Sequence, residues 1–247
     1  MKLSLASKTL SAALATLSGL STSASAQLLN GSFETGLAYP GGLNIFSPGT
    51  PPPWVPTTNG FTPDLYDNTG VDGWNLAGIP LYNNMFQNMI AFAGHRFIGF
   101  GASTQFGGIN EAFEQTVPPL IPGQTYTISA NIAADDLGKA IPYGGPYTGR
   151  GEVRVLLDGN PIGTLTQNTA SLTWQSRSFS FIAPATSSAV FTFVAQLDPS
   201  PGGQASYIGV DDIRLVPAPG AAAVLGLAGL VGCRRRSRVG AASVQAC

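Results

Sequence analysis

The chain has 247 residues and a formal net charge of -1, but its central residues 27–215 hold only six basic residues and all 13 acidic residues, a net charge of -7. Such an acidic domain lacks the basic footprint that a phosphate backbone requires, which excludes nucleic acid as a partner. Both cysteines, Cys233 and Cys247, lie in the C-terminal tail. The central domain therefore has neither a disulfide framework nor a thiolate metal site.

The start of the chain is typical of a secretory signal peptide. Lys2 and Lys8 form a basic region, and an apolar stretch diluted by Ser and Thr runs from Leu10 to Leu20. The small residues at 24–26 then predict a cleavage site for export. We expect residues 1–26 to be removed, which leaves one central domain that is long enough to bury a sizeable core.

The first third of the central domain is rich in chain breakers. Residues 28–35 begin with two leucines and predict a first strand, whereas residues 36–72 contain many prolines and predict long loops. The stretch 81–93 is ambiguous. Its apolar spacing suits one face of a short helix, while its paired asparagines favour a loop.

Strand patterns are clearer in the remainder of the domain. Asp158-Gly159 is a hairpin signal, residues 189–195 are apolar on both faces and predict a central strand, and alternation puts Asp211, Ile213 and Leu215 on one face of the last strand. The predicted strands, most of them from period-two alternation, span 96–100, 112–117, 126–132, 152–157, 161–165, 174–181, 189–195 and 207–215. Many short strands without alternating helices predict an all-β fold, an antiparallel β-sandwich of the jelly-roll kind.

Seven segments follow one another along the central domain in an order typical of a known family. They are NGSFE at 30–34, Gly73-Trp74, FEQ at 113–115, PGQTYTISANIAAD at 122–135, LLDG at 156–159, Trp174, and IGVDDIRL at 208–215. Together they resemble the galactose-binding-like jelly rolls, which include carbohydrate-binding modules related to families 4 and 9. The resemblance spans nearly all of residues 27–215.

This resemblance implies a structural calcium site. A glutamate of the first strand and an aspartate of the last strand commonly share the ion in that family, which corresponds to Glu34 and Asp211 here, with Asp212 as a neighbour. Calcium takes six to eight oxygen ligands, and carboxylates with backbone carbonyls supply them. The alternative is that these carboxylates are solvated charges at the edges of strands.

The resemblance also implies that the domain binds carbohydrate. A sugar site needs aromatic faces for the rings and a few side chains that form hydrogen bonds. Trp74 and Trp174 each begin a strand and are expected to lie in the core, and a buried role is open for Trp54 as well. The ligand-binding candidates are Trp54, Tyr82, Tyr143, Tyr147 and Asp135, with Asn83, Asn84 and Asp136 as polar neighbours.

Catalytic motifs are missing from the sequence. His95 is the one histidine and would have to act as the base of any Ser-His-Asp site, yet no G-x-S-x-G nucleophile elbow occurs. A single His in a domain without Cys also excludes the usual zinc sites. Glycoside hydrolysis by a pair of carboxylates is an alternative that the sequence does not exclude, with Glu111 near Glu114 and Asp135 beside Asp136 as pairs close in sequence. We expect a protein that is not an enzyme, and we assign no catalytic residue.

The C-terminal stretch combines a proline motif, an apolar run and an arginine cluster. The motif VPAP at 216–219 precedes an Ala/Gly/Leu-rich run at 221–231, which is shorter than the roughly 20 residues of an ordinary membrane-spanning helix. The arginines within 234–238 would tend to stay on the cytoplasmic side of a membrane. A short buried core helix is the alternative.

This three-part arrangement resembles the PEP-CTERM sorting signal of exosortase-processed bacterial proteins. The resemblance covers residues 216–238, and a polar tail follows at 239–247. It implies an exosortase-like sorting peptidase as a partner and transient anchoring in the inner membrane through a short apolar helix. The sorting residues would be Val216, Pro217, Pro219, Arg234, Arg235 and Arg236.

The two resemblances together predict an exported protein of the cell surface or extracellular matrix. We expect a non-catalytic carbohydrate-binding module whose partner is an extracellular polysaccharide. A purely structural or adhesive surface protein without a defined ligand is the alternative, and a glycoside-active enzyme is a further one.

Overall fold

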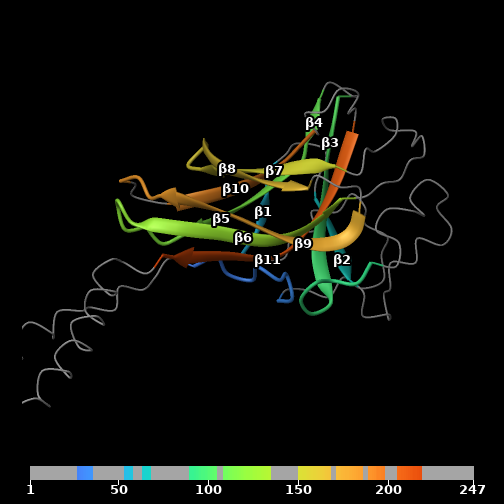
Figure 1. Ribbon diagram of the computed structural model, residues 1–247, viewed down its shortest axis with the longest axis horizontal. Coiled ribbons are helices and arrows are strands. Elements are labelled where there is room, and N and C mark those ends of the chain that lie inside the picture. Colours follow the sequence, from blue (N-terminus) through green and yellow to red (C-terminus); the bar gives the residue numbers. More distant parts are fainter. Residues whose placement is uncertain are drawn as a thin grey trace, which may run out of the picture.

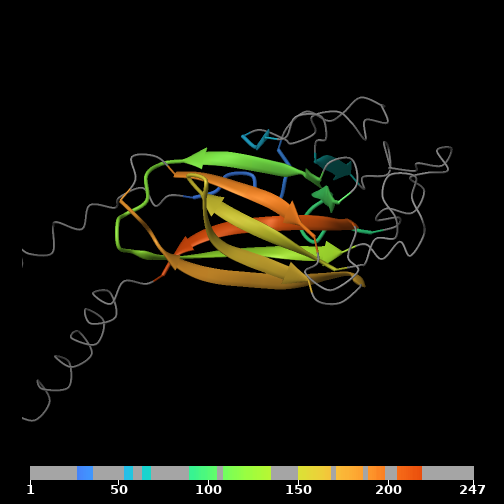
Figure 2. The same cartoon turned by 90° about the horizontal axis from the view of Figure 1, so that it is seen from above.

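Two antiparallel β-sheets face each other in the computed structural model, which describes residues 27–35, 53–57, 63–67, 89–104, 108–134, 150–167, 171–185, 189–197 and 205–218 (Figure 1). Sheet A has the order β1 (Val55–Pro56), β5 (Ala112–Val117), β10 (Ala189–Gln196), β7 (Gly151–Leu157) and β8 (Asn160–Gln167). Sheet B has the order β2 (Asp64–Asp67), β3 (Arg96–Ser103), β11 (Ala205–Pro217), β6 (Thr125–Ala134) and β9 (Ser171–Ile182), and β4 (Ile109–Asn110) pairs with β3. Figure 2 shows the two layers from above.

The predicted fold class is confirmed, because the described residues form an all-β antiparallel sandwich. Period-two alternation buries one face of each sheet, and the burial of β10 alternates strictly along Ala189–Gln196. This strand lies between β5 and β7, so its prediction as a central strand is also confirmed.

The β7–β8 hairpin closes as its sequence predicts. Asp158 and Gly159 have φ values of 50° and 79°, and a two-residue turn with positive φ at both positions matches the twist of the paired strands. The Asp158 carboxylate then accepts the backbone N–H of Val190 at 2.9 Å, which fixes the turn to the neighbouring β10.

The core between the sheets is built largely from aromatic side chains. Phe113 of β5 and Phe193 of β10 stack with ring centroids 5.5 Å apart, and Phe100 of β3 meets Phe113 edge-on at 5.2 Å. All three rings are fully buried. Aromatic pairs in these geometries contribute beyond their area burial, so this cluster joins the two sheets in their middle.

The N-terminal segment differs from its predicted form. Residues 28–35 form a turn rather than a strand, because Phe33 N–H donates to the carbonyl of Asn30 at 3.0 Å and both residues have positive φ. The predicted loop 36–72 is wrong in part, since β1 and β2 lie within it. Of the ambiguous stretch 81–93, only residues 89–93 are described, and they are not helical.

A β-bulge in β11 corrects the predicted facing of the last strand. The register against β6 shifts between Asp211 and Arg214, and Asp212 has a φ of 52°. Val210 and Ile213 both lie in the core, so Asp211 is on the outer face of sheet B, opposite to Ile213.

The last strand also runs beyond the predicted end of the domain at Leu215. Val216 pairs with Thr127 and Pro217 with Tyr126, and Ala218 N–H donates to the Thr125 carbonyl at 2.8 Å. Within the described residues there is no helix with the length and hydropathy that a membrane crossing needs. The predicted signal peptide and the tail beyond residue 218 lie outside the described residues.

Candidate functional site

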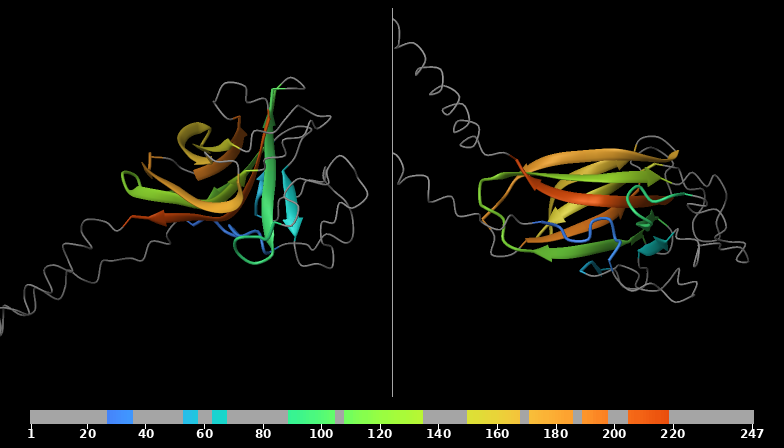
Figure 3. Two further views of the ribbon diagram at one scale, coloured as in Figure 1. Left: turned by 45° about the vertical axis from the view of Figure 1, so that its right-hand side comes forward. Right: turned by 90° about the horizontal axis from the view of Figure 1, so that it is seen from below.

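The N-terminal turn docks onto the bulge of β11. Ile213 N–H donates to the Gly31 carbonyl at 3.0 Å, and a Cβ on Gly31 would lie 2.0 Å from the Ile213 oxygen. The Asn30 side chain closes the turn through two hydrogen bonds to the backbone of Thr35, at 2.8 and 2.9 Å. Figure 3 shows this segment in blue beside β11. The close approach explains why glycine follows Asn30, and it places the next carboxylate, Glu34, beside sheet B.

Residues 89–95, which we call the strap, lead into β3 on this side of the sandwich. The Glu34 carboxylate accepts the backbone N–H groups of His95 at 2.8 Å and Arg96 at 2.7 Å, both through Oε1. Gly94 has a φ of 71°, and a Cβ there would lie 2.4 Å from the Glu34 carboxyl carbon. One carboxylate thus holds the end of the strap against the N-terminal turn.

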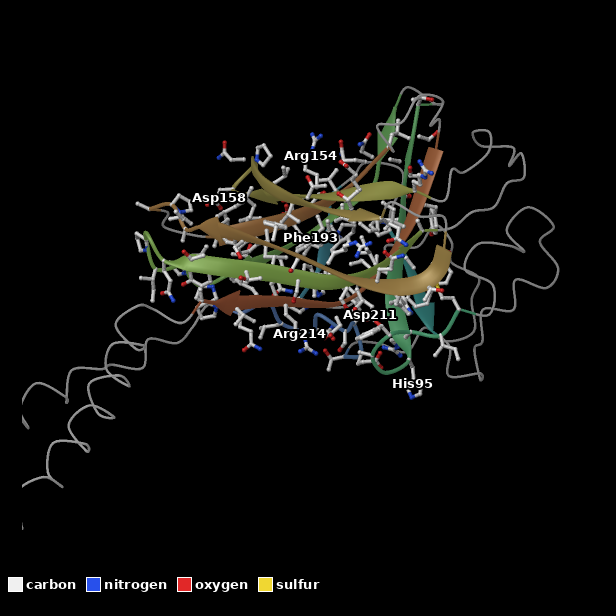
Figure 4. The ribbon with its side chains drawn as sticks, viewed as in Figure 1. His95, Arg154, Asp158, Phe193, Asp211 and Arg214 are labelled. Atoms are coloured by element: carbon white, nitrogen blue, oxygen red, sulfur yellow. The ribbon has the colours of Figure 1, made fainter. Side chains whose placement is uncertain are left out.

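Asp211 of β11 binds the strap from the outer face of sheet B. Its side chain is completely buried, Oδ2 accepts Ala93 N–H at 2.9 Å, and Oδ1 accepts Asp212 N–H at 2.6 Å. Burial raises the pKa of Asp211 to about 7, because a buried carboxylate loses solvation, while hydrogen bonds from Ala93, Asp212 and Phe92 oppose the rise. Figure 4 shows Asp211 and His95 on the same side of the sandwich.

Asp212, predicted as a third carboxylate for a metal, has a different partner. It forms an ion pair with Arg214, with N–O distances of 2.8 and 2.9 Å. In the described ranges, no three His, Cys, Asp or Glu side chains gather as a metal site would require. The structure does bring Glu34 and Asp211 to one strap.

An aromatic cluster lies on the outer face of sheet B under the strap. Tyr66 of β2 stacks on Phe97 of β3 with centroids 4.8 Å apart, and the hydroxyls of Tyr66 and Tyr207 are 3.1 Å apart. A Cβ on Gly99 would approach the Tyr66 ring to 2.5 Å and the Tyr207 ring to 2.9 Å, so glycine in β3 makes room for both rings. Ala91 of the strap packs into this cluster.

Trp174 of β9 lies at the edge of this cluster and differs from its predicted core position. Its ring is half-buried, meets Phe97 edge-on at 5.3 Å, and donates its indole N–H to the Ile90 carbonyl at 2.7 Å. The side chains of Ile90 and Phe92 are 69% and 50% exposed. The partly exposed Trp174 indole is therefore bonded to a segment that carries two exposed apolar side chains, Ile90 and Phe92.

Polar groups continue the outer face next to Trp174. Ser176 of β9 donates its hydroxyl to the Asn131 side chain on β6 at 2.6 Å, and farther along the same strands Thr127 and Ser180 share a hydrogen bond of 2.8 Å. These pairs hold the Ser176 and Ser180 hydroxyls in position on the outer face of β9.

Trp54, predicted as a ligand-binding residue, is instead a core residue. It is 3% exposed, packs against Phe33, Phe113 and Phe193 with centroids 5.3 to 5.8 Å apart, and donates its indole N–H to the Asn30 carbonyl at 2.9 Å. No face of this ring is open to a sugar, which corrects the binding prediction and matches the alternative of a buried role.

The remaining predicted site residues are distributed as follows. Val216 and Pro217 lie in β11, as described above. His95 is exposed at the end of the strap. The residues outside the described ranges are Tyr82, Tyr143, Tyr147, Asp135, Pro219, Arg234, Arg235 and Arg236. Sequence reasoning missed the strap and Trp174 as site elements; the glycine spacing in β3, which leaves room for rings, was the available signal.

No protein-family model matches the chain, and no curated protein sequence matches it. Among solved structures, the chain is similar to TmCBM61 in complex with β-1,4-galactotriose, at 16% identity and a TM-score of 0.42, covering 77% of this chain and 97% of that one. It is also similar to the cyclase Fisc from Fischerella sp. TAU, at 16% identity and a TM-score of 0.48, covering 79% and 98% of the two chains. A third is the C-terminal CBM6 of LamC from Zobellia galactanivorans, at 16% identity and a TM-score of 0.33, covering 50% and 81%.

These similar structures include sugar-binding modules and cyclases, and all three TM-scores are below 0.5. A shared β-sandwich is compatible with unrelated activities, because function depends on the site rather than on the fold. The function of this chain therefore has to be argued from its own residues.

Proposed function

We propose that this chain is an exported, non-catalytic carbohydrate-binding β-sandwich of the cell surface or extracellular matrix. The observation that carries the proposal is the half-buried indole of Trp174, whose position is fixed by Phe97 on one side and by the Ile90 carbonyl on the other. A sugar ring packs on such an aromatic face, and nearby polar groups bind its hydroxyls.

The surroundings of Trp174 supply both kinds of contact. Ile90 and Phe92 extend the apolar surface, and the exposed Ser176 on the same strand as Trp174 offers a hydroxyl, which is held by the buried Asn131 amide. The indole N–H is already bound to Ile90, so the ring face and edge, rather than its donor, are what a ligand would meet. An extracellular polysaccharide is the proposed partner.

Replacement of Trp174 by alanine is expected to weaken polysaccharide binding about 30-fold, the effect of losing an interface residue worth about 2 kcal/mol. The measurement is affinity electrophoresis of the full chain against β-1,4-galactan, laminarin and cellulose. Ile182→Ala is the matched control, because Ile182 lies on the same strand and is 70% exposed but distant from the strap. Absence of binding by the wild type, or equal binding by Trp174→Ala, would contradict the proposal.

We propose further that the segment after β11 directs the protein to the surface through an exosortase-like peptidase, with transient anchoring in the inner membrane. Because Val216 to Ala218 are paired with β6, the test is deletion of residues 219–247 rather than deletion from Val216. Cell fractionation should show a changed location, and the melting temperature should stay within about 2 °C of the wild type, since terminal segments outside a packed core contribute little to stability. Deletion of 239–247 alone is the control and should alter neither.

A structural calcium ion is a further proposal for the same domain. It is supported by two carboxylates, Glu34 and Asp211, which are far apart in the sequence and both bind the backbone of the strap. The carboxylate oxygens of these two residues, which the fold already holds in place, would coordinate the ion. Its test accompanies the pH experiment on Asp211 in the Discussion.

A further inference from the structure

We propose that Glu34 and Asp211 are positioning residues for Trp174: they bind the strap by its backbone N–H groups, and the strap in turn holds the indole in the orientation that receives a sugar. This inference rests on the proposed carbohydrate-binding function and names two residues that act at that site without touching the ligand. Both lie far from Trp174 in the sequence, and their link to it runs through the strap.

The strap is fixed where it passes each of three elements. At its start the Ile90 carbonyl accepts the indole N–H of Trp174 on β9 at 2.7 Å. In its middle Ala93 N–H donates to Asp211 on β11 at 2.9 Å, and at its end His95 N–H donates to Glu34 at 2.8 Å. Since β9, β6, β11 and β3 are neighbours in sheet B, the strap crosses the outer face of the sheet between these contacts.

The side chains of the strap alternate between the sheet and solvent. Ala91 is 7% exposed and packs with Phe97 and Tyr207, whereas Ile90 and Phe92 on either side of it are 69% and 50% exposed. Met89, at the start of the strap, is partly buried and packs against the same cluster, so two side chains anchor the strap by apolar contact. The hydrogen bonds from its backbone N–H groups to the Asp211 and Glu34 carboxyl oxygens add the restraint that fixes the middle and the end of the strap.

Loss of these bonds would free the Ile90 carbonyl to move, and with it the restraint on the Trp174 indole. A ligand would then have to order both the strap and the ring when it binds, and this ordering lowers affinity. Glu34 is half-buried and its bond from His95 N–H is exposed, so we expect its replacement to lower affinity more than stability.

Glu34→Ala is therefore expected to weaken binding of the best-bound member of the galactan, laminarin and cellulose panel about fivefold, the scale of ordering one side chain. The second readout is the indole N–H signal of Trp174 in a ¹⁵N correlation spectrum, which should shift or broaden, together with faster exchange of the Ala93 and His95 amides. Glu34→Gln retains an acceptor oxygen and should restore both readouts to near the wild-type values. Asp211→Asn is measured in parallel well below its melting temperature.

Glu114→Ala is the matched control, because this carboxylate lies on sheet A, away from the strap, and accepts the Thr192 hydroxyl at 3.3 Å. It should leave affinity and the Trp174 signal unchanged. If Glu34→Ala binds as tightly as the wild type, the inference is overturned and the proposed function is left intact. The same holds if the Trp174 indole signal of Glu34→Ala shifts without a loss of affinity. Absence of binding by the wild type would overturn both.

Discussion

Replacement of Trp54 by alanine is expected to lower the free energy of unfolding by about 3–5 kcal/mol, the usual cost of removing a large buried aromatic side chain. Trp54 touches the rings of Phe33, Phe113 and Phe193, so it joins the N-terminal turn to β5 and β10. For a domain of this size the loss corresponds to a fall of about 10 °C in melting temperature. Urea denaturation of the full chain, followed by far-UV circular dichroism, measures it.

Trp54→Phe separates the two contributions of this residue. Phenylalanine retains the aromatic packing but loses the hydrogen bond to the Asn30 carbonyl, and we expect a loss of about 1–2 kcal/mol. Trp174→Ala is the comparison. Because the Trp174 ring is only half-buried, its removal should lower the free energy of unfolding less than Trp54→Ala does, and it should lower the affinity for polysaccharide more. A melting temperature of Trp54→Ala within about 2 °C of the wild type would contradict the core position of this ring.

The free energy of unfolding is expected to fall as the pH rises from about 4 to about 7, by up to about 4 kcal/mol from Asp211 alone. The pKa of this carboxyl is raised from 3.8 to about 7 by burial, so between these values the folded chain retains a proton that the unfolded chain has lost. The stabilisation is fully present below the unfolded pKa and is lost as the pH rises through the folded pKa. Urea midpoints at pH 4, 5.5 and 7.5, measured with chelator, give the slope.

Asp211→Asn should flatten this slope, because an amide does not titrate in the range, whereas Glu114→Gln should leave it unchanged. A slope that is the same in Asp211→Asn and the wild type would show that the buried carboxyl is not its source. Calcium adds a second arm at pH 7.5: an ion bound to ionised Asp211 and Glu34 should raise the melting temperature relative to chelator. No bound metal and unchanged melting would refute the calcium proposal.

Local patterns predicted most of the sheet framework. Alternation in 126–132 predicted β6, the apolar character of both faces in 189–195 predicted the central β10, and Asp158-Gly159 predicted the hairpin, since a turn of this type depends on its own two residues. Prediction failed in the N-terminal segment, where Phe33 adopts a positive φ. That conformation is unfavourable for an isolated residue, and the burial of its ring and the bond of Gly31 to Ile213 stabilise it.

The candidate site was predicted only in part, because its contacts join residues that are far apart in the sequence. The family resemblance named Glu34 and Asp211 together, but their N–H partners at 93–96 were not predicted, because these contacts form only when the strap crosses the sheet. The bulge at Asp212 turned Asp211 to the outer face against its alternation. Trp54 is buried and Trp174 is only half-buried, since the burial of an indole depends on what packs over it.

The sequence by itself determined the fold class, the strand positions with clear alternation, and the acidic and cysteine-free character of the domain. These follow from periodicity, composition and turn chemistry, which act over a few residues. The tertiary structure alone decided which tryptophan is buried, which face Asp211 occupies and what the carboxylates bind. Those outcomes depend on contacts between residues some 60 to 120 positions apart, such as Glu34 with His95 and Asp211 with Ala93, which form only when the sheets assemble.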